Sequence, residues 1–189
     1  MNEEKLQEKL QEKLQATGIV KGVFFSLGTT PTSDPKFDCA NAVIDLINNA
    51  NDTIHIAIYS LTEPQIVDAI IAVHERGIKI SVVLDSHESK VHNESLMISK
   101  LVKAGVDIRV TLRLRTLMHN KIAIIDNNIV ATGSFNWTTS AEKKNDENLI
   151  VIEGTDVAAD YEKYVFQRIL TNETLIRPDD NYIFTGAIE

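Results

Sequence analysis

The chain has 189 residues, 43% of them hydrophobic, which is enough to bury one substantial core. Its formal net charge of −8 argues against nucleic-acid binding as a default, and its single cysteine, Cys39, excludes an intramolecular disulfide and a cysteine-based metal site. The sequence opens on Met-Asn-Glu-Glu-Lys with no apolar run after it, so we expect a cytoplasmic protein without membrane contact.

Residues 1–18 form a predicted N-terminal helix, in which residues 3–16 repeat the tetrapeptide Glu-Lys-Leu-Gln. Leu6, Leu10 and Leu14 recur every four residues and predict a helix with a narrow apolar stripe. We expect this N-terminal helix to dock on the body of the protein, and a short helix that binds a partner is the alternative interpretation.

Residues 19–171 alternate between strand and helix patterns and form the predicted main domain. Runs of β-branched and apolar residues predict strands at 19–27, 53–60, 78–84 and 106–111. Apolar residues at helical spacing predict three helices between these strands, with starts at Asp34-Pro35, Thr62 and Ser95. Because strands that alternate with helices tend to pair in parallel, the pattern predicts an α/β fold with a mixed, largely parallel sheet sandwiched between helices.

The C-terminal part completes the domain with a strand at 148–153 and a helix at about 156–171, which Thr155 can cap. Residues 172–189 form a tail that we expect to pack on the domain. The strand-like Tyr-Ile-Phe-Thr segment in this tail, residues 182–185, would add an edge strand.

A predicted hairpin inside the domain carries the densest group of polar residues. Residues 119–125 and 129–134 are β-rich runs, and Asn127-Asn128 between them suits a two-residue turn. With these two asparagines as the loop, Asp126 pairs with Ile129.

The same register places Lys121 opposite Ser134 and His119 opposite Asn136. Side chains alternate along a strand, so an imidazole, an ammonium, a hydroxyl and an amide converge on one patch, while Asp126 points to the other face. The lysine, serine and asparagine offer donors to an anion, and the histidine can attack or move a proton near neutral pH. The bland alternative is a hairpin with ordinary polar residues on its wet side.

The spacing His-x-Lys-x4-Asp-x6-Gly-Ser-x-Asn runs without a gap from His119 to Asn136. It resembles the signature of the phospholipase D superfamily, and element order extends the likeness over residues 19–171. The sequence is most similar to the small bacterial endonucleases of that superfamily, which carry one motif, a Gly-Ser-Phe-Asn-aromatic segment and a later Glu-Asn pair. Gly133–Trp137 and Glu147-Asn148 match these features.

The resemblance implies a two-step mechanism. His119 would attack phosphorus to form a covalent phosphohistidine, a second histidine would protonate the leaving oxygen, and water would release the product. Lys121, Ser134 and Asn136 would hold the phosphate oxygens, and Glu147 would orient the nucleophile. The predicted catalytic residues are therefore His119, Lys121, Asn136, Glu147 and Asp126.

Positive charge gathers just before the motif, because residues 100–121 hold six lysines and arginines and one aspartate. Such a patch can attract phosphate despite an acidic remainder. Arg113 and Arg115 are candidate nucleic-acid contacts, and arginines that only keep an edge strand soluble are the alternative. Trp137 could stack on a base or pack beside the site.

We expect a nuclease that hydrolyses DNA or RNA phosphodiester bonds with no cofactor and no metal. A lipid phosphodiesterase or phosphatidyl transferase is the second hypothesis, and a catalytically silent phosphate- or nucleic-acid-binding module is the third. Since the chain has one motif and the mechanism needs two histidines, we expect a homodimer with one shared active site.

We expect structural roles for most of the polar residues outside the motif. His87, Glu88 and His92 follow a strand end, where α/β proteins commonly bind ligands, but their spacing fits no zinc pattern. We expect them to form a solvated rim. His55 is expected as a core or rim histidine, and Tyr59, at the end of the same strand, could line the pocket.

Overall fold

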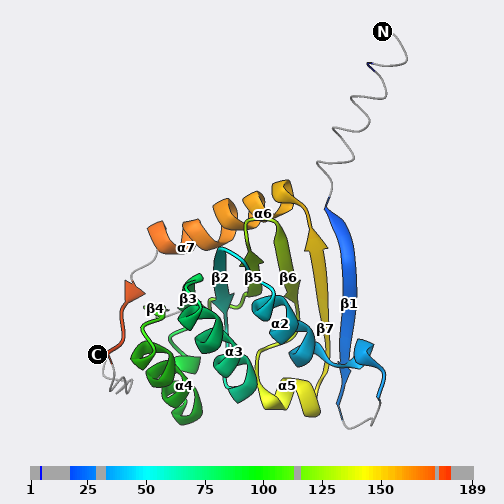
Figure 1. Ribbon diagram of the computed structural model, residues 1–189. Coiled ribbons are helices and arrows are strands. Elements are labelled where there is room, and N and C mark those ends of the chain that lie inside the picture. The colour runs from blue at the N-terminus through cyan, green and yellow to red at the C-terminus, as the bar shows by residue number, and fades with distance from the viewer. Residues whose placement is uncertain (1–4, 6–17, 29–32, 113–115, 173–174, 180–189) are drawn as a thin grey trace.

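The structure is a computed structural model that describes residues 5, 18–28, 33–112, 116–172 and 175–179 (Figure 1). The described residues form one eight-stranded sheet in the order β1-β7-β6-β5-β2-β3-β4-β8. The strands are β1 (Ile19–Leu27), β2 (Thr53–Ile58), β3 (Lys79–Leu84), β4 (Asp107–Thr111), β5 (Lys121–Ile125), β6 (Ile129–Gly133), β7 (Asp146–Glu153) and β8 (Leu175–Ile176).

Strand direction divides the sheet into two parts. The pairs β2–β3 and β3–β4 are parallel, and every other neighbouring pair is antiparallel. The prediction of a largely parallel sheet is therefore wrong. Only β2, β3 and β4 are joined by helical crossovers, whereas the β5–β6 hairpin and its neighbours reverse direction at each step.

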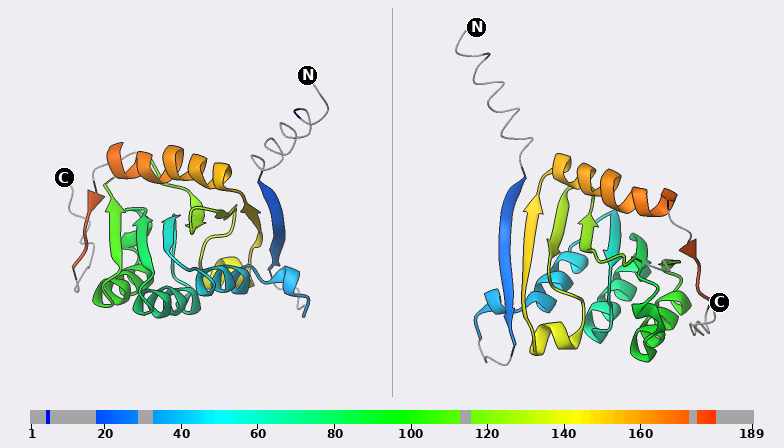
Figure 2. Two further views of the ribbon diagram at one scale, coloured as in Figure 1. Left: turned by 45° about the horizontal axis from the view of Figure 1, so that its top comes forward. Right: turned by 180° about the vertical axis from the view of Figure 1, so that it is seen from behind.

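Helices cover both faces of the sheet (Figure 2). One face carries α2 (Cys39–Asn48), α3 (Pro64–Glu75), α4 (His92–Lys103) and α5 (Thr139–Lys143). The other carries α6 (Thr155–Tyr161), the π-helical turn η3 (Glu162–Phe166) and α7 (Gln167–Asn172). β5 is buried along its whole length, because Ala123 and Ile125 join the core under α2–α4 while Ile122 and Ile124 join the core under α6–α7. The predicted α/β sandwich is confirmed.

Several helix starts differ from their predicted positions. Residues after Asp34 form a separate 3-10 turn, η1 (Pro35–Phe37), and α2 begins only after Asp38, whose carboxylate accepts the N–H of Asn41 at 2.8 Å. The predicted cap by Thr62 is wrong, because Glu63 precedes α3 and Pro64 takes its first position. Thr155 is likewise the first residue of α6 and not its cap. α4 begins at His92, three residues before the predicted Ser95.

The hairpin register differs from the prediction by one residue. Ile125 pairs with Ile129, so the loop holds three residues, of which Asp126 and Asn127 both have φ 52°. Asp126 leaves the strand because its carboxylate and its N–H bond to the segment that enters β2. Asparagine and aspartate tolerate this left-handed conformation better than other non-glycine residues do, so the loop is one that this sequence can form.

The two edges of the sheet are unlike. β1 has no strand on its outer side among the described residues, and it carries exposed apolar side chains at Ile19, Val20, Val23, Phe25 and Leu27. At the opposite edge the two-residue strand β8, from the predicted tail, pairs with β4. The Glu-Lys-Leu-Gln helix and the 182–185 strand fall outside the described residues apart from Lys5. Within the described chain, no helix has both the length and the apolar character that crossing a bilayer requires.

Candidate active site

The motif residues other than Asp126 gather at the end of the sheet where α5 lies (Figure 1). β2 and β3 finish there, β5 starts there with Lys121, β6 finishes there with Gly133, and β7 starts there just before Glu147. Four connections therefore meet at this end of the sheet, although Ile58, which ends β2, and Asp146, which starts β7, are 88 residues apart in sequence.

His119 and Lys121 lie against one aromatic ring. The His119 side chain is exposed, and its ring centroid is 4.5 Å from that of Tyr59, with 57° between the planes. Lys121 is only 7% exposed, its Nζ lies 4.9 Å from the same ring centroid, and it donates to the His119 carbonyl at 3.0 Å. Burial lowers the pKa of Lys121, although the negative charges of Glu147, Asp85 and Glu88 oppose this.

β6 ends at Gly133, directly before Ser134, where its backbone lies against that of Asn148. A Cβ on Gly133 would lie 2.2 Å from the Asn148 carbonyl oxygen, so only glycine fits there. That oxygen accepts the N–H of both Ser134 and Phe135, at 3.1 and 3.3 Å. The chain therefore turns out of β6 at this point, and the predicted pairing of Lys121 with Ser134 and of His119 with Asn136 is wrong.

Ser134 and Glu147 form a linked pair on the rim. Ser134 Oγ donates to Glu147 Oε2 at 2.5 Å, and the backbone N–H of Asn148 donates to Ser134 Oγ at 3.1 Å. Asn145 Nδ2 donates to the other oxygen of Glu147 at 3.1 Å. Both oxygens of Glu147 are thus engaged by residues other than His119, and its role in orienting His119 stays a prediction.

Asn136 is held between two aromatic anchors. Phe135 and Trp137 on either side are 0% and 1% exposed and belong to the core. The Oδ1 atom of Asn136 is buried and has no hydrogen-bond partner among the described residues. An amide with an unpaired buried atom on a rigid turn suits a residue that meets a ligand or a second chain.

Of the three predicted nucleic-acid contacts, Trp137 is the one that the structure describes. Trp137 is buried. Its backbone N–H donates to the Ser60 carbonyl at 3.1 Å, and its backbone carbonyl accepts the N–H groups of Thr62 and Glu63. Base stacking by Trp137 is therefore wrong, and the alternative of packing beside the site is confirmed. Arg113 and Arg115 lie outside the described residues.

Asp126 sits at the other end of the hairpin from the other motif residues. It follows Lys121 by five residues along β5, a separation of roughly 16 Å. Its carboxylate accepts the N–H groups of Asn51, Asp52 and Thr53 at 2.8–3.0 Å. Partial burial raises the pKa of Asp126, but these hydrogen bonds outweigh it, so the pKa lies below its usual value. This geometry favours the indirect role suggested by strand alternation, and a catalytic role for Asp126 stays a prediction.

The loop after β3 belongs to the site more closely than sequence analysis indicated. Asp85 is fully buried, and its Oδ2 accepts the N–H of Met118, directly before His119, at 2.6 Å. Its Oδ1 accepts the N–H of His87 at 2.8 Å. The position of Asp85 at the end of a parallel strand was the only sequence signal for it. Its role depends on the contact with Met118, which is 33 residues away in sequence. No three potential ligand side chains among the described residues cluster closely enough to hold a metal ion.

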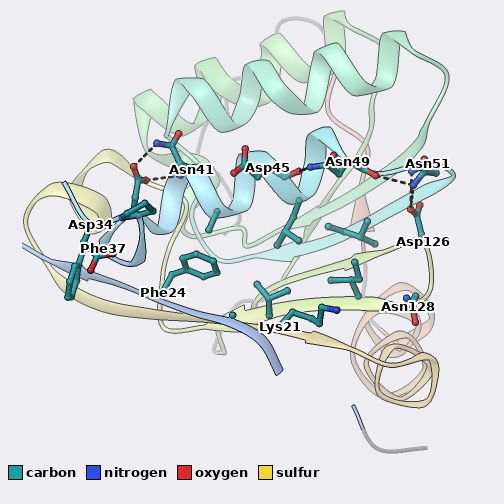
Figure 3. Close-up of a pocket in the computed structure, with 18 of the residues that line it drawn as sticks. Lys21, Phe24, Asp34, Phe37, Asn41, Asp45, Asn49, Asn51, Asp126 and Asn128 are labelled. Carbon is teal, nitrogen blue, oxygen red and sulfur yellow. Dashed lines mark hydrogen bonds between the residues drawn. The ribbon is translucent and has the colours of Figure 1, made fainter. Parts of the chain in front are cut away.

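A hollow of about 890 Å³ lies away from the motif, between α2 and the strands β1, β6 and β7 (Figure 3). Phe24, Asn41, Asp45 and Asn49 line it, and Asp126 closes one end. None of the other motif residues lines this hollow. Its carboxylates would repel a phosphate, so the site is assigned from the motif and not from the hollow.

The fold and the site together define the phospholipase D class of α/β domains. A family model described as "Cardiolipin synthase, PLD-like domain" matches residues 43–170, and the chain belongs to this phospholipase D-like family. The match covers the parallel strands, the hairpin, β7 and the helix on the far face.

Three known proteins illustrate the likeness. The phospholipase D of Rickettsia conorii is 32% identical over 127 residues, which are 67% of this chain and 62% of that protein. A mitochondrial cardiolipin hydrolase of Chlamydomonas reinhardtii is 30% identical over 134 residues, 71% of this chain and 56% of that protein. The crystal structure of Nuc, a phospholipase D family member from Salmonella typhimurium, superposes with a TM-score of 0.74 and 26% identity, over 85% of this chain and 99% of that one. The chain thus spans about three fifths of the length of these two curated relatives.

Proposed function

We propose that the protein is a phosphodiesterase that cleaves nucleic acid through a covalent phosphohistidine on His119. The observation that carries the proposal is the exposed imidazole of His119 beside the buried ammonium of Lys121, on one aromatic surface. A nucleophile and a fixed cation at one point are the two elements that attack on a phosphate diester needs.

The reaction divides into two balanced steps. A ring nitrogen of His119 attacks phosphorus, the P–O bond to the leaving group breaks, and a second histidine gives its proton to the leaving oxygen. Water then attacks phosphorus, the N–P bond breaks, and the water proton returns to the second histidine. Lys121, Ser134 and Asn136 act as donors to the phosphate oxygens, so side chains supply the electrostatic stabilisation.

Support for nucleic acid comes from the subtype motif at Gly133–Trp137 with Glu147-Asn148 and from the likeness to Nuc over nearly all of that chain. Lipid phosphodiesters are the second candidate, because relatives that match this chain are named phospholipase D and mitochondrial cardiolipin hydrolase. The same nucleophile and the same donors would serve either substrate.

The proposed active form is a homodimer with one shared site. This chain carries a single His-x-Lys motif, and the mechanism uses two histidines. A two-fold axis near His119 would supply the second histidine from the partner. The buried, unpaired Oδ1 of Asn136 is consistent with a surface that meets another group.

The test measures cleavage of single- and double-stranded DNA and RNA beside turnover of phosphatidylcholine and cardiolipin vesicles. His119→Ala should abolish the activity. His74→Ala is the matched control, because His74 lies in the last turn of α3, at the end of the sheet away from the motif. Lipid turnover without nucleic-acid cleavage would reject the substrate assignment, and equal losses in the two variants would reject the site.

A further inference from the structure

Tyr59 lies at the centre of the candidate site although it is not part of the motif. It directly follows β2, and its N–H donates to the carbonyl of Asn120, the residue between His119 and Lys121, at 2.8 Å. The backbone of Tyr59 is therefore bonded to the segment that carries the nucleophile and the cation.

The ring of Tyr59 contacts both reactive groups. Its centroid is 4.5 Å from that of His119 and 4.9 Å from the Nζ of Lys121. An ammonium over an aromatic face is attracted by the ring quadrupole, and a tilted pair of aromatic rings is a favoured arrangement. One rigid side chain thus fixes two flexible ones relative to each other.

The hydroxyl of Tyr59 is tied to a third element. Burial raises the pKa of Tyr59 to about 12, and its hydrogen bond to Glu88 and the charges of Glu88 and Asp85 act in the same direction. The phenol is therefore neutral at ordinary pH and donates to Glu88. Glu88 begins η2 (Glu88–Lys90), in the loop that Asp85 anchors to the backbone before His119.

We propose that Tyr59 is a positioning residue that holds the His119 imidazole and the Lys121 ammonium in the geometry needed to act on one phosphate. Glu88 fixes Tyr59 in turn. This inference rests on the proposed function, because it assigns Tyr59 a task only if His119 and Lys121 are the reacting pair.

The kinetic test uses bis(p-nitrophenyl) phosphate, a diester that is neither nucleic acid nor lipid. Tyr59→Leu removes the ring and should lower kcat on the order of 10²-fold with little change in KM, because misplacement of the nucleophile weakens the transition state more than binding. Tyr59→Phe keeps the ring and should lower kcat only about fivefold, the effect of one hydrogen bond. Glu88→Ala should match Tyr59→Phe, and the double variant should be no worse than either one, because they break the same bond.

Tyr164 offers a matched control. Lys163 Nζ lies 4.8 Å from the centroid of the Tyr164 ring, a contact of the same kind on η3, and Tyr164 is 59% exposed. Tyr164→Leu and Tyr164→Phe should leave kcat within twofold of the parent. If Tyr59→Leu behaves like Tyr164→Leu, Tyr59 has no positioning role.

Proton NMR of the His119 ring gives a readout that needs no turnover. The Tyr59 ring current should shift the His119 ring protons in the parent and in Tyr59→Phe, and Tyr59→Leu should lose this shift while its unfolding midpoint stays close to that of Tyr59→Phe. Unchanged His119 resonances in Tyr59→Leu would overturn the inference. Full activity in His119→Ala would instead overturn the proposed function, so the two failures are distinguishable.

Discussion

At the scale of single residues, Glu94 is a buried carboxylate next to the candidate site. Glu94, in the first turn of α4, is completely buried, and it accepts hydrogen bonds from Ser60 Oγ at 2.8 Å and from the N–H of Leu61 at 3.0 Å. Burial raises its pKa from 4.5 to about 7, against the effect of these two bonds. Glu94 thus fixes the end of β2 next to Tyr59, but as an anion it destabilises the fold.

The pH dependence of this effect can be measured. Below pH 4.5 Glu94 is protonated in both states, and as pH rises toward about 7 the unfolded state loses its proton first, so stability falls across this window. Glu94→Gln keeps a donor and an acceptor but cannot ionise. Relative to the parent, it should gain about 3 kcal/mol of unfolding free energy between pH 4 and pH 8. Urea unfolding at both values tests this, and a constant difference would contradict it.

The residues that bond to each other on the rim should matter less than the nucleophile. His119→Ala should lower turnover by many powers of ten and leave the fold intact, as removal of a nucleophile does elsewhere. Glu147→Gln should cost less, because it changes charge and orientation and keeps an oxygen that can accept from Ser134. Single-turnover rates and circular dichroism check both, and residual activity within about tenfold in His119→Ala would contradict its role.

At the scale of elements, the hairpin joins chemistry at one end to anchoring at the other. Lys121 opens β5 beside His119, whereas Asp126 closes it and bonds three successive backbone N–H groups before β2. The contiguous sequence motif therefore has two parts joined by β5: the His119–Lys121 pair at one end and the Asp126 anchor at the other. The short helix α5 and the Gly133 contact with β7 complete the frame around the reactive end.

Asp126→Ala should lower stability without disabling the chemistry. Three backbone N–H groups would lose their acceptor, of which those of Asn51 and Asp52 are at exposed residues and that of Thr53 is at a half-buried one, so the loss should cost about 1–2 kcal/mol of unfolding free energy. Activity per folded molecule should stay within a few-fold of the parent. Because the folded pKa is depressed, the contribution of Asp126 is present above its unfolded pKa and is lost as pH falls through the folded pKa. Asp160→Ala, at an exposed position on α6, is the control and should change stability by less than about 0.5 kcal/mol.

At the scale of the whole molecule, the proposed shared site makes a prediction about mixed dimers. Parent and His119→Ala chains would be unfolded together, refolded, and isolated as mixed dimers with two tags. Each mixed dimer should be nearly inactive, because its one site would lack a histidine. Half of the parent activity, or an active species that sediments as a monomer, would reject the shared site.

Metal independence is a second property of the whole enzyme. The proposed nucleophile and the phosphate donors are side chains, so no ion is needed to activate water. Activity on nucleic acid should therefore survive excess EDTA. Loss on chelation with rescue by magnesium or zinc would show that the proposed mechanism is wrong.

Much of this molecule could be predicted from local pattern, and the larger errors come from contacts between distant segments. The motif spacing identified His119 and Lys121, and the strand patterns located most of the sheet. Strand direction, the hairpin register and the burial of Trp137 depend on contacts between distant segments, such as Asp126 with residues 51–53 and Trp137 with Leu61. α5 is only five residues long, too short for helical periodicity to show.

The unlike edges of the sheet limit how copies of the protein can adhere to one another. β1 offers a nine-residue edge with exposed apolar side chains, whereas the β4–β8 edge is short and carries the ion pairs of Asp107 with Arg109 and Arg177. Charged, short edges resist the addition of further strands. If two molecules join through β1, each covers the one long apolar edge that its described residues offer. Strand-to-strand growth of the sheet itself would then stop at two molecules.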